Sequence, residues 1–183
     1  YQIIPGLSTK INSVRYSISD KGLLTYKDSL KIFSSVQSGD QFDTDVLMSE
    51  RKKITDYFQN KGFYSFNKEF IFFEVDTLNS IEKVDLTLGI QNFKKLDPAT
   101  NQFYELPHQQ YKLNRIKVKI RSPLNINHFN CRDSLKTQTL SIYNYQPIDY
   151  QKRLLKNAIT FTKNDFYRKN DAAETYKRLI GLG

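Results

Sequence analysis

Cysteine and histidine are scarce in this sequence of 183 residues: Cys131 is the single cysteine, and His108 and His128 are the two histidines. One cysteine excludes a disulfide within the chain, and so few of these side chains leave a metal site short of ligands. A glycine-rich phosphate-binding loop is absent as well. Without a base, a nucleophile or a metal held in one constellation, the sequence predicts neither an enzyme nor a cofactor or metal site. Cys131 is interpreted as a small, partly buried residue.

Long hydrophobic runs are missing too. No stretch approaches the ~20 apolar residues of a membrane-spanning helix, and the chain opens at Tyr1 without the pattern of a signal peptide. We therefore expect a processed protein or an excised fragment. The hydrophobic content of 39%, with 14% aromatic residues, is sufficient for packed cores and argues against wholesale disorder.

Positive charge is concentrated in the second half of the chain. Residues 1–93 carry 11 Lys and Arg against 12 Asp and Glu, whereas residues 94–183 carry 17 against 7, which gives the net charge of +9. A basic half fits nucleic acid, an anionic lipid surface or an acidic partner. A plain solvated surface explains the same charge.

Residues 38–64 have the strongest local pattern. Asp43 is a good N-cap, and Leu47, Ile54 and Phe58 follow at helical spacing, with Val46 and Tyr57 widening the apolar stripe. Gly62 is the expected left-handed stop. The pattern predicts a helix over 44–60 whose Leu47, Ile54 and Phe58 are buried against a sheet.

Part of the chain repeats. Asp40, Phe42, Glu50 and Ile54 match Asp165, Tyr167, Thr175 and Leu179 at an offset of 125 positions. A second set, from residues 5–18, matches residues 107–120 at an offset of 102. Two ordered matches predict two copies of one module, while chance similarity between amphipathic helices is the alternative.

The first copy is predicted to be a two-layer α+β module in the order β-α-α-β-β. Strands are predicted over 10–20, 66–75 and 83–90, and helices over 24–36 and 44–60. The strand at 83–90 alternates through Val84, Leu86 and Leu88, which we expect beneath the helices. Both helices should cover one face of a three-stranded mixed sheet.

The second copy is predicted to be incomplete. It has a strand over 114–120, helices over 148–158 and 169–182, and an insertion at 121–147 that holds one strand over 137–145. Its last two strands are expected to be missing. The predicted organisation is thus the end of a preceding module (1–6), a full module (7–92), a linker (93–107) and a second module (108–183).

Three short motifs, together with the predicted order of strands and helices, resemble those of a known protein family. They are the turn Gly39-Asp40-x-Phe42-Asp43, the exit Asn60-x-Gly62-Phe63-Tyr64 and the junction Y-x-I-x-P-G at 1–6. The sequence resembles POTRA (polypeptide-transport-associated) domains, which stand in tandem before the membrane barrel of BamA/TamA-type outer-membrane assembly proteins. Residues 164–183 resemble the last domain before the barrel, and residues 66–77 are most similar to Bacteroidota members of the family. The insertion at 121–147 is long for such a domain.

The resemblance implies a periplasmic scaffold rather than a catalyst, attached to the outer membrane through a C-terminal barrel. Its expected partners are unfolded outer-membrane proteins and periplasmic accessory proteins or chaperones. The family's second strand commonly forms an exposed sheet edge, to which an extended segment adds as a further strand. That edge maps to 66–75, with the candidate residues Lys68, Phe70, Ile71, Phe72, Phe73, Glu74 and Val75. Coverage of this edge by a neighbouring module is the alternative.

A basic strand over 112–121 supports a rival interpretation. Alternation places Arg115, Lys117, Lys119 and Arg121 on one side of this strand, and Tyr111, Tyr143 and Tyr145 supply rings on which bases stack. A nucleic-acid-binding module is therefore the alternative function, although a half-buried strand disposes of its polar side chains in the same way. No nucleic acid is expected if the family resemblance holds.

Overall fold

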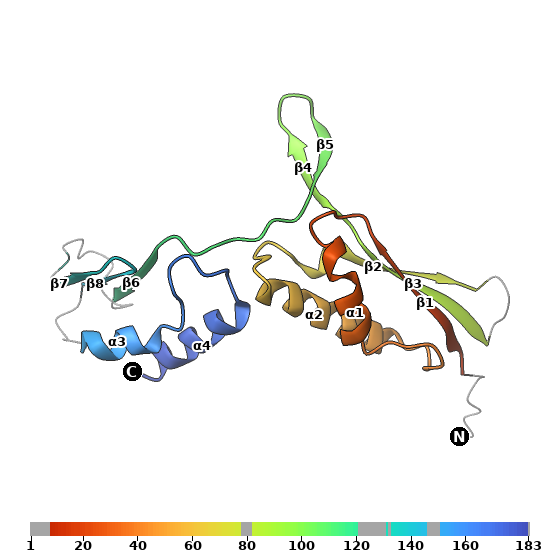
Figure 1. Cartoon of the computed structure of the whole chain (residues 1–183), viewed down its shortest axis with the longest axis horizontal. Coiled ribbons are helices and arrows are strands. Elements are labelled where there is room, and N and C mark those ends of the chain that lie inside the picture. Colours follow the sequence, from red (N-terminus) through yellow and green to blue (C-terminus); the bar gives the residue numbers. More distant parts are fainter. Residues whose placement is uncertain (1–7, 78–81, 121–130, 132, 146–150, 183) are drawn as a thin grey trace, which may run out of the picture. The chain divides into compact units, whose positions relative to one another are not determined.

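The computed structural model describes residues 8–77, 82–120, 131, 133–145 and 151–182. The chain divides into two compact units, which are described separately (Figure 1). Unit 1 comprises residues 1–59 and 65–109, and unit 2 comprises residues 60–64 and 110–183. Residues 1–6, predicted to end a preceding module, lie outside the described residues.

The sheet of unit 1 has three strands, β1 (Lys10–Ile18), β2 (Ile71–Asp76) and β3 (Lys83–Ile90), in the order β1-β3-β2. β1 runs parallel to β3, and β2 runs antiparallel to it. A parallel pair needs a long crossover connection. Here the 3-10 helix η1 (Leu24–Tyr26), α1 (Lys27–Phe33) and α2 (Thr44–Asn60) supply it.

The predicted helix over 44–60 is confirmed as α2. The Asp43 carboxylate accepts a hydrogen bond from the Asp45 amide at 2.8 Å, as an N-terminal cap does. Beyond the helix, Gly62 has φ +101°, the left-handed conformation expected of a stop. The sequence therefore defined both ends of this helix.

The core of unit 1 lies between the helices and one face of the sheet (Figure 1). Leu47 packs with Ile11, Val84 and Leu86. Phe58 is fully buried, with its ring centroid 4.7 Å from that of Phe66. The predicted register of α2 is therefore correct. Val46, which was expected to widen the buried stripe, is exposed instead, because it lies beside the loop that follows α1.

The predicted linker at 93–107 contains a hairpin, which corrects the sequence interpretation. β4 (Phe93–Asp97) and β5 (Gln102–Leu106) pair with each other and stand away from the three-stranded sheet (Figure 1). Asp97 organises the turn, because its carboxylate accepts from the Ala99 amide at 2.9 Å and from the Thr100 hydroxyl at 2.9 Å. Such a turn closes two extended segments against each other.

The sheet of unit 2 has the same order and strand directions as that of unit 1. β6 (Ile116–Ile120) runs parallel to β8 (Leu140–Asn144), and β7 (Asp133–Lys136) runs antiparallel to β8 at the edge. α3 (Lys152–Ala158) and α4 (Lys169–Ile180) bury Leu155 and Leu179 against it. The α+β class, with two helices on one face of a mixed three-stranded sheet, is confirmed.

The content of the insertion corrects the sequence prediction. It was expected to hold one strand, but its described residues hold two, β7 and β8. They occupy the sheet positions that β2 and β3 occupy in unit 1, but they precede the helices in the chain. Among the described residues the sheet of unit 2 has three strands, all of which precede α3 and α4. β7 and β8 can pair directly after β6 because they form an antiparallel hairpin, which needs no crossover connection.

The internal repeat extends to individual backbone hydrogen bonds. Each unit joins its first strand segment to the turn before its second helix by three equivalent bonds. In unit 1 they run from Ile11 N to Asp40 O, Gly39 N to Ile11 O and Phe42 N to Thr9 O. In unit 2 they run from Leu113 N to Asp165 O, Asn164 N to Leu113 O and Tyr167 N to Tyr111 O. Gly39 and its equivalent Asn164 both have positive φ, at 95° and 73°. The repeated segments thus form equivalent hydrogen bonds, although the strands and helices of the two units follow one another in a different order along the chain.

Candidate functional site

The predicted edge strand lies at the edge of the unit 1 sheet. β3 occupies the centre, so β2 has a partner on one side and no described strand of unit 1 on the other. The residues of an edge strand whose backbone N–H and C=O groups point away from the sheet can form hydrogen bonds with an added strand. The topology required for strand addition is therefore present at β2.

The start of this strand differs from the prediction. Residues Lys68–Phe70 form the 3-10 helix η2, and β2 begins only at Ile71. Asn67 causes the change, because its side chain accepts from the Glu69 amide at 2.8 Å and caps the turn. Lys68 and Phe70 are therefore not strand residues, and the predicted alternation applies from Ile71 onward.

Most aromatic side chains of β2 are engaged within unit 1. Ile71 and Phe73 pair with Ile90 and Leu88 on the face beneath the helices. Phe72 lies across Gly89 on the opposite face, where a Cβ atom on Gly89 would stand 2.0 Å from the ring. The exposed part of the strand is Glu74, Val75 (41% exposed) and Asp76. The exposed part of the strand is therefore shorter and more acidic than the sequence indicated.

A buried carboxylate and imidazole pair lies beside η2. The Asp20 side chain accepts hydrogen bonds from the Gly22 amide at 2.7 Å, the His108 amide at 2.6 Å and His108 Nδ1 at 2.7 Å. The rings of Phe66 and Phe70 lie 5.0 and 4.5 Å from the imidazole. The pair ties residue 108 to the end of β1, because its two members are 88 positions apart in the sequence.

Burial lowers the pKa of His108, and the hydrogen bond and charge of Asp20 oppose this shift without overcoming it. Nε2 is buried and has no hydrogen-bond partner, so a proton there would be a donor without an acceptor. The hydrogen on Nδ1 is assigned from its carboxylate partner. The folded state therefore favours the neutral imidazole.

We expect the free energy of unfolding to fall as the pH drops below about 6.5, the pKa of an unperturbed histidine. Above that pH the imidazole is neutral in both states. Below it the unfolded chain takes up a proton on His108 while the folded chain does not. The free energy of unfolding then falls by up to about 1.4 kcal/mol per pH unit until the folded-state pKa is reached. Denaturant melts between pH 7.5 and 5 of the wild type and of His108→Gln isolate this contribution. A wild type that gains stability on acidification relative to the variant would show that Asp20 keeps the imidazole charged.

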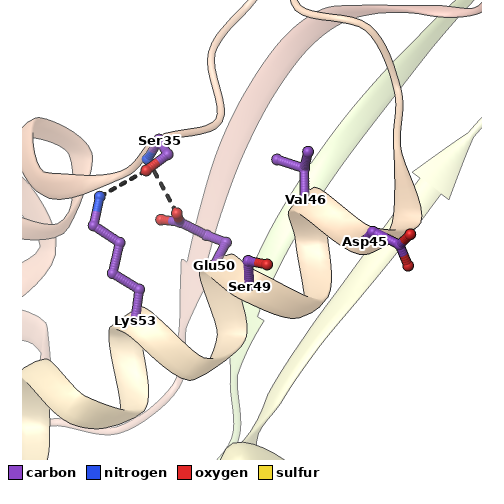
Figure 2. A pocket seen from close by; sticks show the side chains of 6 residues that line it. All are labelled: Ser35, Asp45, Val46, Ser49, Glu50 and Lys53. Atoms are coloured by element: carbon purple, nitrogen blue, oxygen red, sulfur yellow. Dashed lines mark hydrogen bonds between the residues drawn. The ribbon is translucent and has the colours of Figure 1, made fainter.

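A pocket of about 260 Å³ lies between α2 and the loop that follows α1, lined by Ser35, Asp45, Val46, Ser49, Glu50 and Lys53 (Figure 2). Glu50 is 1% exposed, and its Oε2 accepts from the Ser35 amide at 3.1 Å. Lys53 Nζ donates to the Ser35 hydroxyl at 2.7 Å and to the Phe33 carbonyl at 2.5 Å. These bonds fasten the loop after α1 to α2.

The outer sheet face of unit 2 is basic. Ile116, Val118 and Ile120 of β6 pack toward the core, so Lys117 and Lys119 project from the other face. In the paired strands, that face carries Ser134, Lys136, Ser141 and Tyr143. It has no acidic side chain on β6, β7 or β8. Arg115 is exposed just before β6, and Arg121 lies outside the described residues.

Within the described residues, no group of three or more His, Cys, Asp and Glu side chains could hold a metal ion. Cys131 is exposed rather than partly buried, and its Sγ donates to the Asp133 carbonyl at 3.1 Å. Across the same residues, every helix is too short or too polar to span a membrane. The features available for function are therefore strand edges, charged faces and the pocket on α2.

Sequence reasoning missed Asp20, the pairing of His108 and the pocket around Glu50. Glu50 was identified only as an element of the repeat, where it aligns with Thr175. The buried position of Glu50 follows from its helical spacing with Leu47 and Ile54, so this signal was available. Asp20 had no comparable signal, because its partner is remote in the sequence.

Comparison with solved structures found a likeness to a set of POTRA domains. The chain aligns over its whole length with 89% of a crystal structure of Haemophilus influenzae BamA POTRA3-5, at 9% sequence identity and a TM-score of 0.43. No protein-family model matches the sequence. No curated protein matches it either.

Proposed function

We propose that this chain forms two POTRA-like modules in the periplasmic part of an outer-membrane protein assembly factor. The modules bind extended segments of unfolded outer-membrane proteins, or of periplasmic accessory proteins, for delivery to a membrane barrel. The observation that carries the proposal is the outer edge of β2, which pairs with no described strand of unit 1, in a module of order β-α-α-β-β. The duplicated hydrogen bonds and the turn motif Gly39-Asp40-x-Phe42-Asp43 support the tandem arrangement.

Strand addition suits a scaffold that meets many client sequences. Backbone amides and carbonyls supply the affinity, and they are the same in every client. The exposed stretch Glu74, Val75 and Asp76 offers these groups beside two carboxylates. Charged residues on an edge limit self-association of the protein, while a client strand with basic or neutral side chains can still pair. Lys68, Phe70, Ile71, Phe72 and Phe73 then support the edge rather than grip the client.

Proline substitution at Glu74 and at Val75 tests the docking edge. Successive residues of a strand turn their backbone groups to opposite sides, so one proline breaks the ladder with β3 and the other removes only an outward donor. We expect one variant to melt at a lower temperature. The other should melt like the wild type but bind unfolded outer-membrane protein peptides about tenfold more weakly, the loss of roughly one to two hydrogen bonds.

Fluorescence anisotropy with labelled peptides gives the affinities, and circular dichroism establishes which variant keeps its fold. Ile32→Ala serves as the control, because Ile32 is an exposed residue of α1, away from β2 in the sequence. A proline at this position would break α1 and is therefore not used. Peptide affinity equal to wild type in the proline variant with the intact melt would rule out β2 as the docking edge.

The basic outer face of unit 2 adds an anionic lipid surface as a second proposed partner. Lys117, Lys119 and Lys136 project from one sheet face on which β6, β7 and β8 carry no carboxylate, and each lysine near an anionic membrane contributes about 1 kcal/mol. Nucleic acid fits less well. On the three strands the face offers a single ring, Tyr143, and Lys136 Nζ lies 5.9 Å from its centroid, whereas single-stranded nucleic acids bind along successive aromatic platforms.

A further inference from the structure

The duplicated module provides an internal comparison for the buried Glu50. The loop residue Ser35 and the helix residue Glu50 correspond to Thr160 and Thr175, each 125 positions later. In unit 1 the Ser35 amide donates to the Glu50 carboxylate at 3.1 Å, and in unit 2 the Thr160 amide donates to the Thr175 hydroxyl at 3.1 Å. A neutral hydroxyl therefore performs the same structural task, and the fold does not require a carboxylate at this position.

The second oxygen of that carboxylate has no partner. Glu50 Oε1 is buried without a hydrogen bond, which leaves an anionic acceptor desolvated and uncompensated. Lys53 does not neutralise it as an ion-pair partner, because its ammonium is directed to the Phe33 carbonyl and the Ser35 hydroxyl. Figure 2 shows this arrangement, with Ser35 placed between Lys53 and Glu50.

The pocket beside Glu50 has the composition of a site for a cationic side chain. It holds a second carboxylate, Asp45, and a hydroxyl, Ser49, and Val46 adds an apolar wall that is 43% exposed. Lysine and arginine carry a cationic head on an alkyl stem. The head would supply the donor that Oε1 lacks, through a charge-assisted hydrogen bond, and the stem would pack against Val46. The terminal torsion of a glutamate is soft, so a small rotation of the carboxylate brings Oε1 to the pocket.

We propose that the pocket formed by Ser35, Asp45, Val46, Ser49, Glu50 and Lys53 binds a lysine or arginine side chain of a partner polypeptide. The site lies on the first half of α2 and the loop after α1, and it shares no residue with the β2 edge. It stands whether or not extended segments dock on β2. A basic anchor residue in the partner would thus be recognised separately from its backbone.

Three short peptides test the site by NMR on the isotope-labelled chain. They are acetyl-Gly-Lys-Gly-amide, acetyl-Gly-Arg-Gly-amide and the uncharged analogue acetyl-Gly-norleucine-Gly-amide. We expect saturable shifts of the Ser35, Val46, Ser49 and Glu50 amides with at least one cationic peptide, at millimolar dissociation constants, and no saturation with norleucine. Comparing the lysine peptide with the arginine peptide shows whether the pocket prefers an ammonium or a guanidinium group.

Glu50→Thr is the matched variant, because Thr175 fills this position in the second module. It should keep the fold, seen as an unchanged spread of amide resonances, and weaken the cationic peptide at least tenfold. Glu50→Gln keeps the size of the side chain and should weaken it similarly, which covers the case that Glu50→Thr unfolds. Asp28→Asn removes an exposed carboxylate that does not line the pocket and should leave the affinity unchanged.

Several results would overturn the proposal. They are the absence of saturable shifts with either cationic peptide, equal binding of the norleucine peptide, and wild-type affinity in a folded Glu50→Thr or Glu50→Gln variant. An equal loss in Asp28→Asn would also contradict it, because the attraction would then be a property of net charge rather than of this pocket. The β2 proline variants are expected to bind these tripeptides like the wild type, so the two proposals can fail independently.

Discussion

Replacing Phe58 with alanine should lower the free energy of unfolding of unit 1 by about 3–5 kcal/mol. The side chain is fully buried, and the rings of Phe66 and Tyr26 lie 4.7 and 5.8 Å from its own. Removing it leaves a cavity that these rings can fill only by moving out of their edge-on and tilted contacts. Because a domain is stable by only about 5–15 kcal/mol, the loss is a large part of the total.

Chemical denaturation followed by circular dichroism measures this effect, and Phe103→Ala is the matched control. The same atoms are removed there from a ring that is 71% exposed on the β4–β5 hairpin. A surface change of this kind should alter the free energy of unfolding by no more than about 0.5 kcal/mol. Similar losses in the two variants would mean that Phe58 does not occupy the core of unit 1.

Replacing Asp20 with alanine should be comparably damaging, at about 3–5 kcal/mol, because each buried donor left without an acceptor costs about 1–3 kcal/mol. The buried carboxylate accepts from the backbone amides of Gly22, Leu23 and His108 and from the His108 imidazole. Alanine would remove the acceptor of all these donors, and the amide and imidazole of His108 are buried where water cannot replace it. Asp20→Asn retains one acceptor oxygen and the shape of the side chain, so we expect it to lose less.

The measurement is again denaturant unfolding, combined with the imidazole resonance of His108, which a His128→Gln variant assigns. Asp28→Ala provides the control, because that carboxylate is exposed and pairs only with Lys31 on the surface. Its removal should have little effect. If Asp20→Ala is as stable as Asp28→Ala, the buried pair does not hold residue 108 to the turn after β1.

The sequence was most informative where local chemistry determines structure. Asp43 and Gly62 define the ends of α2 by capping and by positive φ, and both act on their immediate neighbours. The apolar spacing of Leu47, Ile54 and Phe58 gave the buried face correctly. The duplicated turn was also visible in the sequence. Asp40 and Phe42 recur as Asp165 and Tyr167, and the two pairs make equivalent backbone hydrogen bonds.

The two missed hairpins lack the glycine signals on which sequence reasoning depends. The β7–β8 turn uses the Thr137 hydroxyl, which accepts from the Leu140 amide at 3.0 Å, in place of an Asn-Gly pair. The β4–β5 turn uses Asp97 and Asn101, the latter with φ +53°. Asp97-Pro98 was interpreted as a linker, although aspartate before proline also favours a turn.

The candidate site was only partly visible because tertiary contacts decide it. Phe72 was a candidate residue of the docking edge, but the neighbouring strand presents Gly89 opposite it, and the ring covers the Gly89 backbone. Asn67 converts Lys68–Phe70 from strand to a 3-10 turn. Neither effect can be deduced from strand propensity, since one depends on cross-strand register and the other on a single capping bond.

The way in which each sheet is connected also bears on the order in which the units fold. In unit 1 the parallel strands bring together residues such as Asn12 and Asp85, which are 73 positions apart. Such pairing must wait until the intervening helices are in place, because distant contacts are reached slowly. In unit 2 the β7–β8 hairpin is local, and hairpins close in about 1–10 μs. Two modules with one architecture thus have different contact orders, and the sheet of unit 2 can be nucleated before that of unit 1.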